Sequence, residues 1–240
     1  MTDTAQHIEA LRENLAAVRR RIAAAERAAG RPEGSVDLLP VTKFHPAEHV
    51  ALLAELGITD VAENREQEAR AKAEAIPALR FHMIGQIQSK KANAVARWAG
   101  AVHSLDSLKL ATGLERGMAL ALERGERGED NAVLPVYLQV SVDGDGARGG
   151  VPAADLDELA DAVSDSEHLE LAGLMVVPPL GEDPTPVFEK TRIMADEMGE
   201  RLGRPLRLSA GMSGDLEAAV AAGSDVVRVG TDVMGHRPLA

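Results

Sequence analysis

The chain has 240 residues, of which 45% are hydrophobic and 27% are charged, as in an ordinary folded globular protein. The formal net charge of -12 argues against broad binding to the phosphate backbone of nucleic acids, and the lack of cysteine excludes disulfides and thiolate metal sites. The N-terminal segment is charged and amphipathic instead of forming an apolar signal core, and no apolar run is long enough to cross a membrane. We expect a cytoplasmic protein without nucleic-acid or membrane partners.

Helical and strand patterns alternate along the chain after a first predicted helix at residues 8–29. Strands are predicted at residues 36–42, 60–63, 80–84, 101–105, 134–142, 169–177, 206–209 and 226–229. Helices are predicted between them at residues 46–56, from 65, at 89–98, from Asp106 as the N-cap to about 124, and at 155–163, 185–202 and 215–222. A glycine-rich loop at residues 143–150 follows the fifth strand.

This alternation of strands and helices predicts a parallel sheet. Eight such units in a chain of 240 residues fit a single (β/α)8 TIM-type barrel with an extra N-terminal helix, formed by residues 1–240 as one domain. An open doubly wound sheet is the alternative. The absence of a GxGxxG motif after the first strand weighs against that alternative.

Lys43 stands at the end of the first predicted strand, whose residues 36–42 are mostly apolar. Such a strand is buried on both faces in a parallel sheet, so a lysine at its end points into a confined space. Burial disfavours the ammonium form, and a neutral lysine amine is a nucleophile that forms Schiff bases with aldehydes. The alternative is a lysine whose amine reaches solvent from the end of the strand.

The loops after the seventh and eighth strands are the usual phosphate site of a (β/α)8 barrel. The first of them contains Met212, Ser213 and Gly214 and opens a predicted helix, whose free N–H groups favour an anion. The second contains Gly230 and Thr231, which allow close backbone approach and add a hydroxyl. The alternatives are that Ser213 is only an N-cap and that Gly230 and Thr231 form only a turn.

A Schiff-base lysine and a phosphate site at one barrel mouth indicate a phosphorylated aldehyde, either pyridoxal 5′-phosphate (PLP) or a phosphosugar. Arg228 precedes Gly230 by two residues, so its side chain should point inward or toward the mouth. A permanently charged donor there would face the pyridine nitrogen, keep it unprotonated and weaken the ring as an electron sink. The alternative for Arg228 is a surface ion pair with Asp225 or Glu217.

Other polar residues carry weaker signals. We interpret His82, in the third strand, as a packing residue, and Asn64 either caps the helix that follows it or belongs to the site. The histidines at 103, 168 and 236 show no metal-ligand spacing. No HExxH, CxxC or Ser-His-Asp arrangement indicates a hydrolase or a metal enzyme.

Several segments together resemble the pyridoxal phosphate homeostasis proteins, which are single-domain relatives of the barrel half of alanine racemase (fold type III). In chain order they are residues 38–43 (LLPVTK), 62–68 (AENREQE), 81–91 (FHMIGQIQSKK), 172–175 (AGLM), 209–213 (SAGMS) and 227–231 (VRVGT). No segment is specific alone, but the ordered set is, and the resemblance covers nearly the whole chain.

The resemblance implies roles for individual residues. Lys43 would carry the Schiff base with PLP, and Arg228 would face the pyridine nitrogen. The residues expected to hold the phosphate are Ser213, Gly230 and Thr231, with Met212 shaping the loop and Asn64 beside the cofactor.

The sequence also departs from the family pattern around the mouth. Ala62 stands where the family usually has glycine, Thr42 where it has serine, and Phe44-His45 where it has a threonine-lysine pair. Gln86 and Lys90 differ from the usual residues around the Gln-Ser motif, and Arg148 replaces a common lysine. The aldehyde-binding lysine itself is retained.

The expected function is to hold PLP as a Schiff base and to serve intracellular PLP homeostasis without strong catalysis. Alanine racemases use a second, β-rich domain that supplies a tyrosine base, whereas this chain ends at Ala240 and its single tyrosine, Tyr137, lies in the fifth strand. We therefore expect a monomer that is not an enzyme and that passes PLP to PLP-dependent apo-enzymes. The alternatives are a weak PLP-dependent racemase or transaminase-like enzyme and a phosphosugar Schiff-base lyase.

Overall fold

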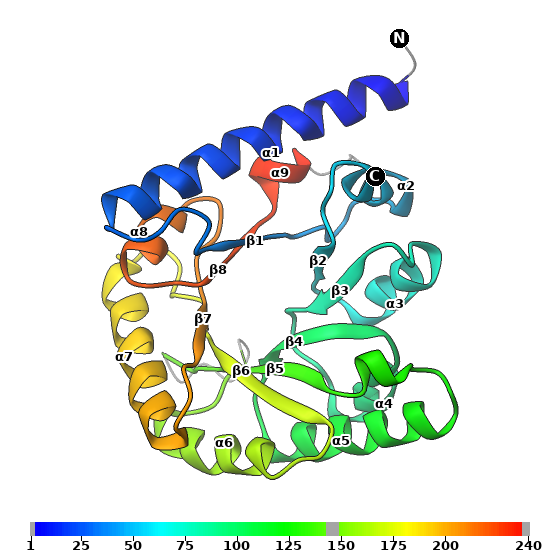
Figure 1. Cartoon of the computed structure of the whole chain (residues 1–240), viewed down its shortest axis with the longest axis vertical. Coiled ribbons are helices and arrows are strands. Elements are labelled where there is room, and N and C mark those ends of the chain that lie inside the picture. Colours follow the sequence, from blue (N-terminus) through cyan, green and yellow to red (C-terminus); the bar gives the residue numbers. More distant parts are fainter. Residues whose placement is uncertain (1–2, 143–148, 237–240) are drawn as a thin grey trace.

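The computed structural model describes residues 3–142 and 149–236, and these form a ring of strands surrounded by helices (Figure 1). The strands are β1 (Asp37–Pro40), β2 (Asp60–Glu63), β3 (Arg80–Met83), β4 (Ala99–Leu105), β5 (Leu134–Gln139), β6 (Leu169–Met175), β7 (Arg207–Ser209) and β8 (Val226–Val229). The helices are α1 (Asp3–Ala28), α2 (Ala47–Glu55), α3 (Glu66–Ala75), α4 (Ala92–Trp98), α5 (Leu108–Glu123), α6 (Leu156–Ser164), α7 (Thr185–Leu202), α8 (Leu216–Ala221) and α9 (Thr231–Met234).

All strand pairs are parallel, in the order β1-β8-β7-β6-β5-β4-β3-β2. The ring is closed between β1 and β2 by a bridge between Val41 and Ala62, where the Thr42 N–H donates to the Ala62 carbonyl at 2.9 Å. The predicted (β/α)8 barrel with an added N-terminal helix is confirmed, and the open doubly wound alternative is wrong.

The predicted boundaries agree closely with the structure, with a few corrections. The N-cap of α5 is Ser107, whose hydroxyl accepts a hydrogen bond from the Leu110 N–H at 3.3 Å, and not Asp106. The fifth strand ends at Gln139 instead of Val142, and the short helix α9 after Gly230 was not predicted. Most of the predicted glycine-rich loop, including Arg148, lies outside the described residues.

The apolar core lies mainly between the strands and the surrounding helices. Along β8, Val227 and Val229 pack with the helices, whereas Val226 belongs to a small cluster inside the barrel, because successive residues of a strand point to opposite faces. This interior cluster is small and consists of Leu39, Val41, Ala62 and Val226. It leaves space inside the barrel for buried polar side chains, including His103, Ser209 and Arg228.

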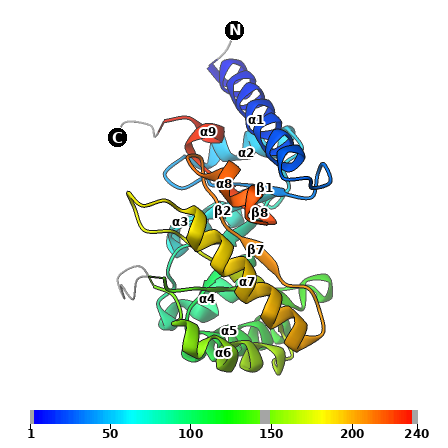
Figure 2. The same ribbon diagram turned by 90° about the vertical axis from the view of Figure 1, so that its left-hand side faces the viewer.

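Helix α1 packs against α8 and α9, outside the ring of strands (Figures 1 and 2). Its Arg21 forms ion pairs with Glu217 and Asp232 and donates to the Ser213 carbonyl at 2.9 Å. The added helix therefore fixes the loops that follow β7 and β8. Within the described ranges, no helix combines the length and apolar character needed to cross a bilayer.

Candidate functional site

One pocket at the carboxyl ends of the strands brings together all of the predicted site residues. It has a volume of about 400 Å³, a size suited to a small cofactor. Its lining includes Lys43, Asn64, Met212, Ser213, Arg228, Gly230 and Thr231, together with Val41, Ile84, Met175, Val177 and Gly214. A second pocket of about 320 Å³, toward β5, shares Asn64, Ile84, Met175 and Val177 with it.

Lys43 follows β1 in a turn that the structure holds tightly. Phe44 has a φ of 69°, a left-handed conformation that is unusual for a bulky residue. The Phe44 N–H donates to Glu68 at 2.9 Å, and the Lys72 ammonium donates to the Thr42 carbonyl at 3.0 Å. These contacts fix the backbone on both sides of Lys43, whose half-buried side chain reaches the pocket.

A buried ion pair supports this turn from behind. The Lys72 ammonium contacts Glu63 at 2.6 Å and Glu68 at 2.9 Å, and Thr42 Oγ1 donates to Glu63 at 2.6 Å. Burial raises the pKa of Glu63, while the hydrogen bonds from Lys72 and Thr42 act in the opposite direction. In the described part of the chain, Glu63 Oε2 has no hydrogen-bond partner, so Lys72 and Thr42 supply the hydrogen bonds to this carboxyl group through Oε1.

Asn64 lies at the exposed rim of the pocket, against the backbone of Gly85. A Cβ at Gly85 would meet the Asn64 carbonyl oxygen at 2.0 Å and its side-chain oxygen at 2.8 Å. The Ser104 hydroxyl also donates to the Gly85 carbonyl at 2.6 Å. Glycine is therefore required at position 85, because β2 and β3 approach each other closely where they enter the mouth.

Replacing Gly85 with alanine should lower the free energy of unfolding by about 1–3 kcal/mol, since the added methyl group forces the Asn64 backbone to move. Urea denaturation measures this change. Gly128→Ala is the matched control, because Gly128 has a φ of -83° and no atom within 4 Å of an added Cβ. Equal stability of the two variants would show that the close approach at Gly85 is not needed.

The loop after β7 does not use Ser213 as a helix cap, which was the alternative to its predicted phosphate role. The N-cap of α8 is Asp215, and not Ser213, and the Asp215 carboxylate accepts the Met212 N–H at 2.5 Å. Across the described residues, the Ser213 hydroxyl has no hydrogen-bond partner. It remains available at the pocket, whereas Asp215 places a carboxylate close to the loop predicted to bind phosphate.

The loop after β8 leaves open space at the pocket. A Cβ on Gly230 would approach no atom closer than 3.6 Å, so packing within the protein does not demand glycine there. Its lack of a side chain keeps the backbone accessible from the pocket. Thr231, which begins α9, is exposed beside it.

Arg228 is a buried cation at the base of the pocket, with a residue exposure of 3%. It donates to Ser209 Oγ at 2.7 Å and to the Val176 carbonyl at 3.0 Å. Burial lowers its pKa to about 10, against a smaller opposing effect of Asp215, so it is charged at neutral pH. No carboxylate of the described residues forms an ion pair with it.

The ion pair that was the alternative for Arg228 is not formed. Asp225 is paired with Arg31 and Arg192, and Glu217 is paired with Arg21. A buried guanidinium with only neutral partners is costly unless other acceptors complete its hydrogen bonds. It can therefore bind a ligand atom that has a lone pair.

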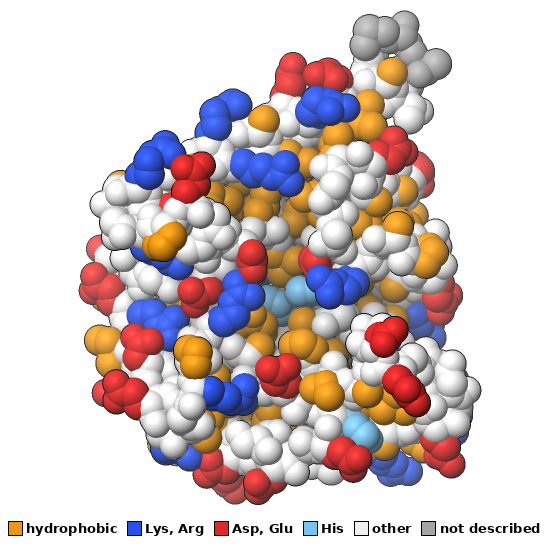
Figure 3. Space-filling model, viewed as in Figure 1, with side chains coloured by type: hydrophobic (Ala, Val, Ile, Leu, Met, Phe, Trp, Pro, Cys, Tyr) orange, Lys and Arg blue, Asp and Glu red, His pale blue; other side chains and the backbone are white. Residues whose placement is uncertain are grey.

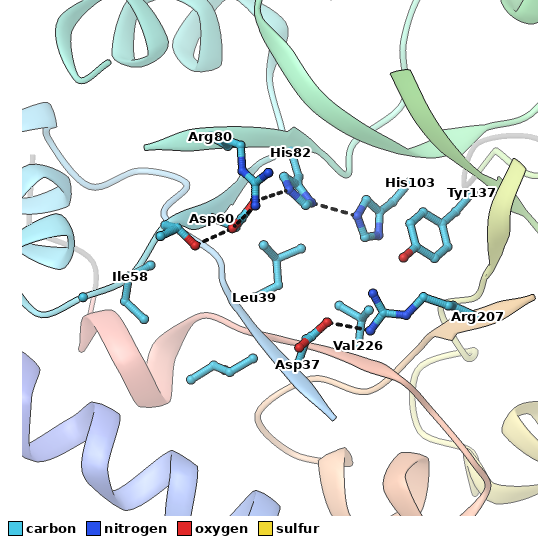
Figure 4. Close-up of a pocket in the computed structure, with 13 residues that line it drawn as sticks. Asp37, Leu39, Ile58, Asp60, Arg80, His82, His103, Tyr137, Arg207 and Val226 are labelled. Atoms are coloured by element: carbon cyan, nitrogen blue, oxygen red, sulfur yellow. Dashed lines mark hydrogen bonds and ion pairs between the residues drawn. The ribbon is translucent and has the colours of Figure 1, made fainter. Parts of the chain in front are cut away.

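The opposite mouth of the barrel contains a polar pocket that was not predicted, with a volume of about 370 Å³. Figure 4 shows the ion pairs Asp37–Arg207 and Asp60–Arg80 on its walls, with His82 hydrogen-bonded to Asp60. His82, which we interpreted as a packing residue, therefore lines a pocket. The signal available in the sequence was polar residues at the starts of several strands.

Tyr137 also lies at this opposite mouth. Its ring stacks on His103 with a centroid separation of 4.3 Å, and both residues line the pocket of Figure 4. Lys43 lines the pocket at the other mouth. The only tyrosine is thus placed away from Lys43. In the described ranges, no cluster of His, Cys, Asp and Glu could hold a metal ion.

Comparison with known proteins places the chain in a family. The model of the alanine racemase N-terminal domain matches residues 9–238. The pyridoxal phosphate homeostasis protein of Corynebacterium glutamicum is 59% identical over 210 residues, which cover 88% of this chain and 94% of that protein. The chain belongs to the pyridoxal phosphate homeostasis protein family. A further member, from Escherichia coli (strain K12), is 35% identical over 232 residues and covers 93% of this chain and 95% of its own.

Solved structures of the family and its relatives share the fold. PipY of Synechococcus elongatus, determined with PLP bound, has a TM-score of 0.78 and 33% identity, and covers 94% of this chain and 100% of its own. An alanine racemase of Clostridium difficile has a TM-score of 0.71 at 18% identity and covers 96% of this chain but 58% of its own. The similarity to this alanine racemase, at 18% identity, shows a shared fold only.

The departures from the family pattern fall in different surroundings. Ala62 is buried inside the barrel, where its small side chain joins the interior cluster. Phe44 is half-buried, with the Arg65 guanidinium 5.3 Å from its ring centroid, and His45 is buried. Gln86 and Lys90 are exposed, so these two positions change the surface near the mouth instead of the pocket floor.

Proposed function

We propose that this protein binds PLP at the carboxyl-end pocket, holds it as a Schiff base on Lys43 and serves PLP homeostasis. The observation that carries the proposal is a lysine, a buried unpaired guanidinium and free hydroxyl-bearing loops around one pocket of about 400 Å³. These groups fit the aldehyde, the pyridine nitrogen and the phosphate of PLP. The family members named for PLP homeostasis and PLP-bound PipY support it.

The residues would have separate tasks in holding PLP. Lys43 binds the aldehyde carbon, while Ser213, Gly230 and Thr231 hold the phosphate with hydroxyl and backbone groups. Met212 shapes the phosphate loop, and Asn64 lies beside the ring at the rim. Bound PLP supplies an electrophilic carbon and a ring that withdraws electrons.

Arg228 would limit the withdrawal of electrons by the PLP ring. As a permanent donor to the pyridine nitrogen, it keeps this nitrogen unprotonated, so the ring stabilises a carbanion weakly. Tyr137, at the opposite mouth, is not positioned to move a proton on the Lys43 side. We therefore propose storage and delivery of PLP to PLP-dependent apo-enzymes by a monomeric carrier, not amino-acid racemisation.

Two assays test this proposal, one for loading of the protein with PLP and one for transfer of PLP to another enzyme. The protein is incubated with PLP, freed of excess by gel filtration, and mixed with an apo-transaminase whose activity is then followed. We expect PLP uptake, recovery of transaminase activity, and alanine racemisation no faster than with PLP alone. Sustained racemisation would favour the weak-enzyme alternative, and failure to take up PLP would favour a phosphosugar ligand.

A further inference from the structure

A chain of hydrogen bonds crosses the barrel interior from the opposite mouth to Arg228. Asp60 Oδ1 lies 3.0 Å from His82 Nε2, and His82 Nδ1 lies 3.1 Å from His103 Nε2 (Figure 4). His103 Nδ1 lies 2.9 Å from Ser209 Oγ, and Arg228 donates to the same oxygen at 2.7 Å. Each group comes from a different strand, in the order β2, β3, β4, β7 and β8.

The outer end of this chain is anchored by a carboxylate. Burial raises the pKa of Asp60, but hydrogen bonds from His82, Arg80 and Thr59 outweigh it and hold the pKa well below its usual value. An ionised carboxylate only accepts hydrogen bonds, so His82 donates through Nε2. Figure 3 shows histidine side chains in the hollow at the centre of this face, bordered by charged side chains.

When both imidazole rings are neutral, this carboxylate determines which atoms of His82, His103 and Ser209 donate and which accept. His82 Nδ1 is then an acceptor, so His103 donates to it through Nε2. His103 Nδ1 becomes an acceptor in turn and receives the Ser209 hydroxyl hydrogen. His103 fits the neutral form, because its side chain is enclosed and burial lowers its pKa well below the usual value.

The resulting direction of the hydrogen bonds stabilises the buried positive charge of Arg228. In this series of hydrogen bonds, every bonded hydrogen points away from the guanidinium toward Asp60, and every accepting lone pair points toward the guanidinium. This arrangement partly compensates the buried cation without placing a carboxylate beside it, where an anion would compete for its N–H groups. It also makes Ser209 one of only two acceptors that orient Arg228 within the described structure, the other being the Val176 carbonyl.

We infer that these residues form a directed relay that positions Arg228 for the pyridine side of PLP, in the order Asp60, His82, His103 and Ser209. The inference rests on the proposed function for its cofactor, but the direction of the relay is a property of the protein alone. His103 and Ser209 are positioning residues, since they act through Arg228. The relay also connects the cofactor pocket to the polar pocket at the opposite mouth.

The direction of the relay is tested without PLP. Two-bond ¹H–¹⁵N spectra of the apo-protein at pH 7 report the tautomer and charge of each histidine ring. We expect each ring to carry its proton on Nε2 and to leave Nδ1 unprotonated. A proton on Nδ1 of either ring, or a charged imidazolium at either position, would overturn the directed relay.

The positioning role is tested with Ser209→Ala. Removing one of the two acceptors of Arg228 should weaken PLP binding about tenfold, the effect of losing one charge-assisted hydrogen bond, and should shift the absorbance maximum of bound PLP. Thr191→Val is the matched control, because the Thr191 hydroxyl is also buried and donates to the Val187 carbonyl within α7. It should leave affinity and absorbance unchanged.

The outcomes separate the relay from the proposed function. Wild-type affinity and absorbance in Ser209→Ala would overturn the positioning role, even if stability falls. If the unsubstituted protein took up no PLP, the proposed function would fail, and the histidine tautomers would still decide the relay. The same spectra decide it if Ser209→Ala does not fold.

Discussion

Lys43→Ala is expected to abolish covalent attachment of PLP, so that borohydride reduction no longer fixes PLP to the protein. The reason is that Lys43 is the lysine that lines the carboxyl-end pocket, and alanine offers no amine. The phosphate loops and Arg228 are unchanged, so non-covalent PLP is still expected to bind, with lower affinity. Absorbance before and after reduction, followed by mass measurement of the intact protein, checks both parts.

A matched substitution separates this effect from a general loss of lysine. Lys190→Ala removes an exposed lysine from α7 and should leave the reducible band as in the unsubstituted protein. Lys72 is the buried lysine near the turn, but its ammonium already donates to Thr42, Glu63 and Glu68. A reduced adduct in Lys43→Ala that maps to another lysine would contradict the assignment.

Lys72→Met should lower the free energy of unfolding by about 3–5 kcal/mol, because it leaves the Glu63 carboxylate buried without a counter-charge. Glu63 has no exposed surface, and only Thr42 would still donate to it. The Thr42 carbonyl also loses one of its two donors and keeps only the His45 N–H at 3.2 Å, so the turn that presents Lys43 should loosen and PLP affinity should fall. Urea denaturation and PLP titration measure the two effects.

Two further variants test the electrostatic explanation. Lys190→Met, at an exposed position, should change stability by less than about 0.5 kcal/mol. The double variant Glu63→Gln/Lys72→Met removes both charges and should recover a large part of the loss, since no uncompensated carboxylate remains. If Lys72→Met were as stable as Lys190→Met, the buried pair would not support the turn.

Much of the barrel follows from local patterns in the sequence. The strand β2 and the helix α7 begin and end where alternation and helical spacing predict, because a buried strand and an amphipathic helix carry their periods in the sequence. The predicted site residues meet in one pocket for the same reason, since parallel strands bring their carboxyl ends to one mouth. Their roles toward PLP remain predictions.

Other features depend on contacts between distant residues. Neither Lys72 nor Glu63 is distinctive in the sequence, yet their burial together behind Lys43 is set by how α3 packs on β2. The alignment of His82 with His103 requires the register between β3 and β4, where the pairing shifts. The N-cap Ser107 was missed because Asp106 beside it has a similar capping ability, and backbone geometry selects one of the two.

The most direct test of the account is the absorbance spectrum of the PLP-loaded protein before and after borohydride, with peptide mapping of the reduced product. The account predicts a visible band that reduction removes, and a pyridoxyl group on the peptide that contains Lys43. A protein that takes up no PLP, or a pyridoxyl group on any other lysine, would contradict it.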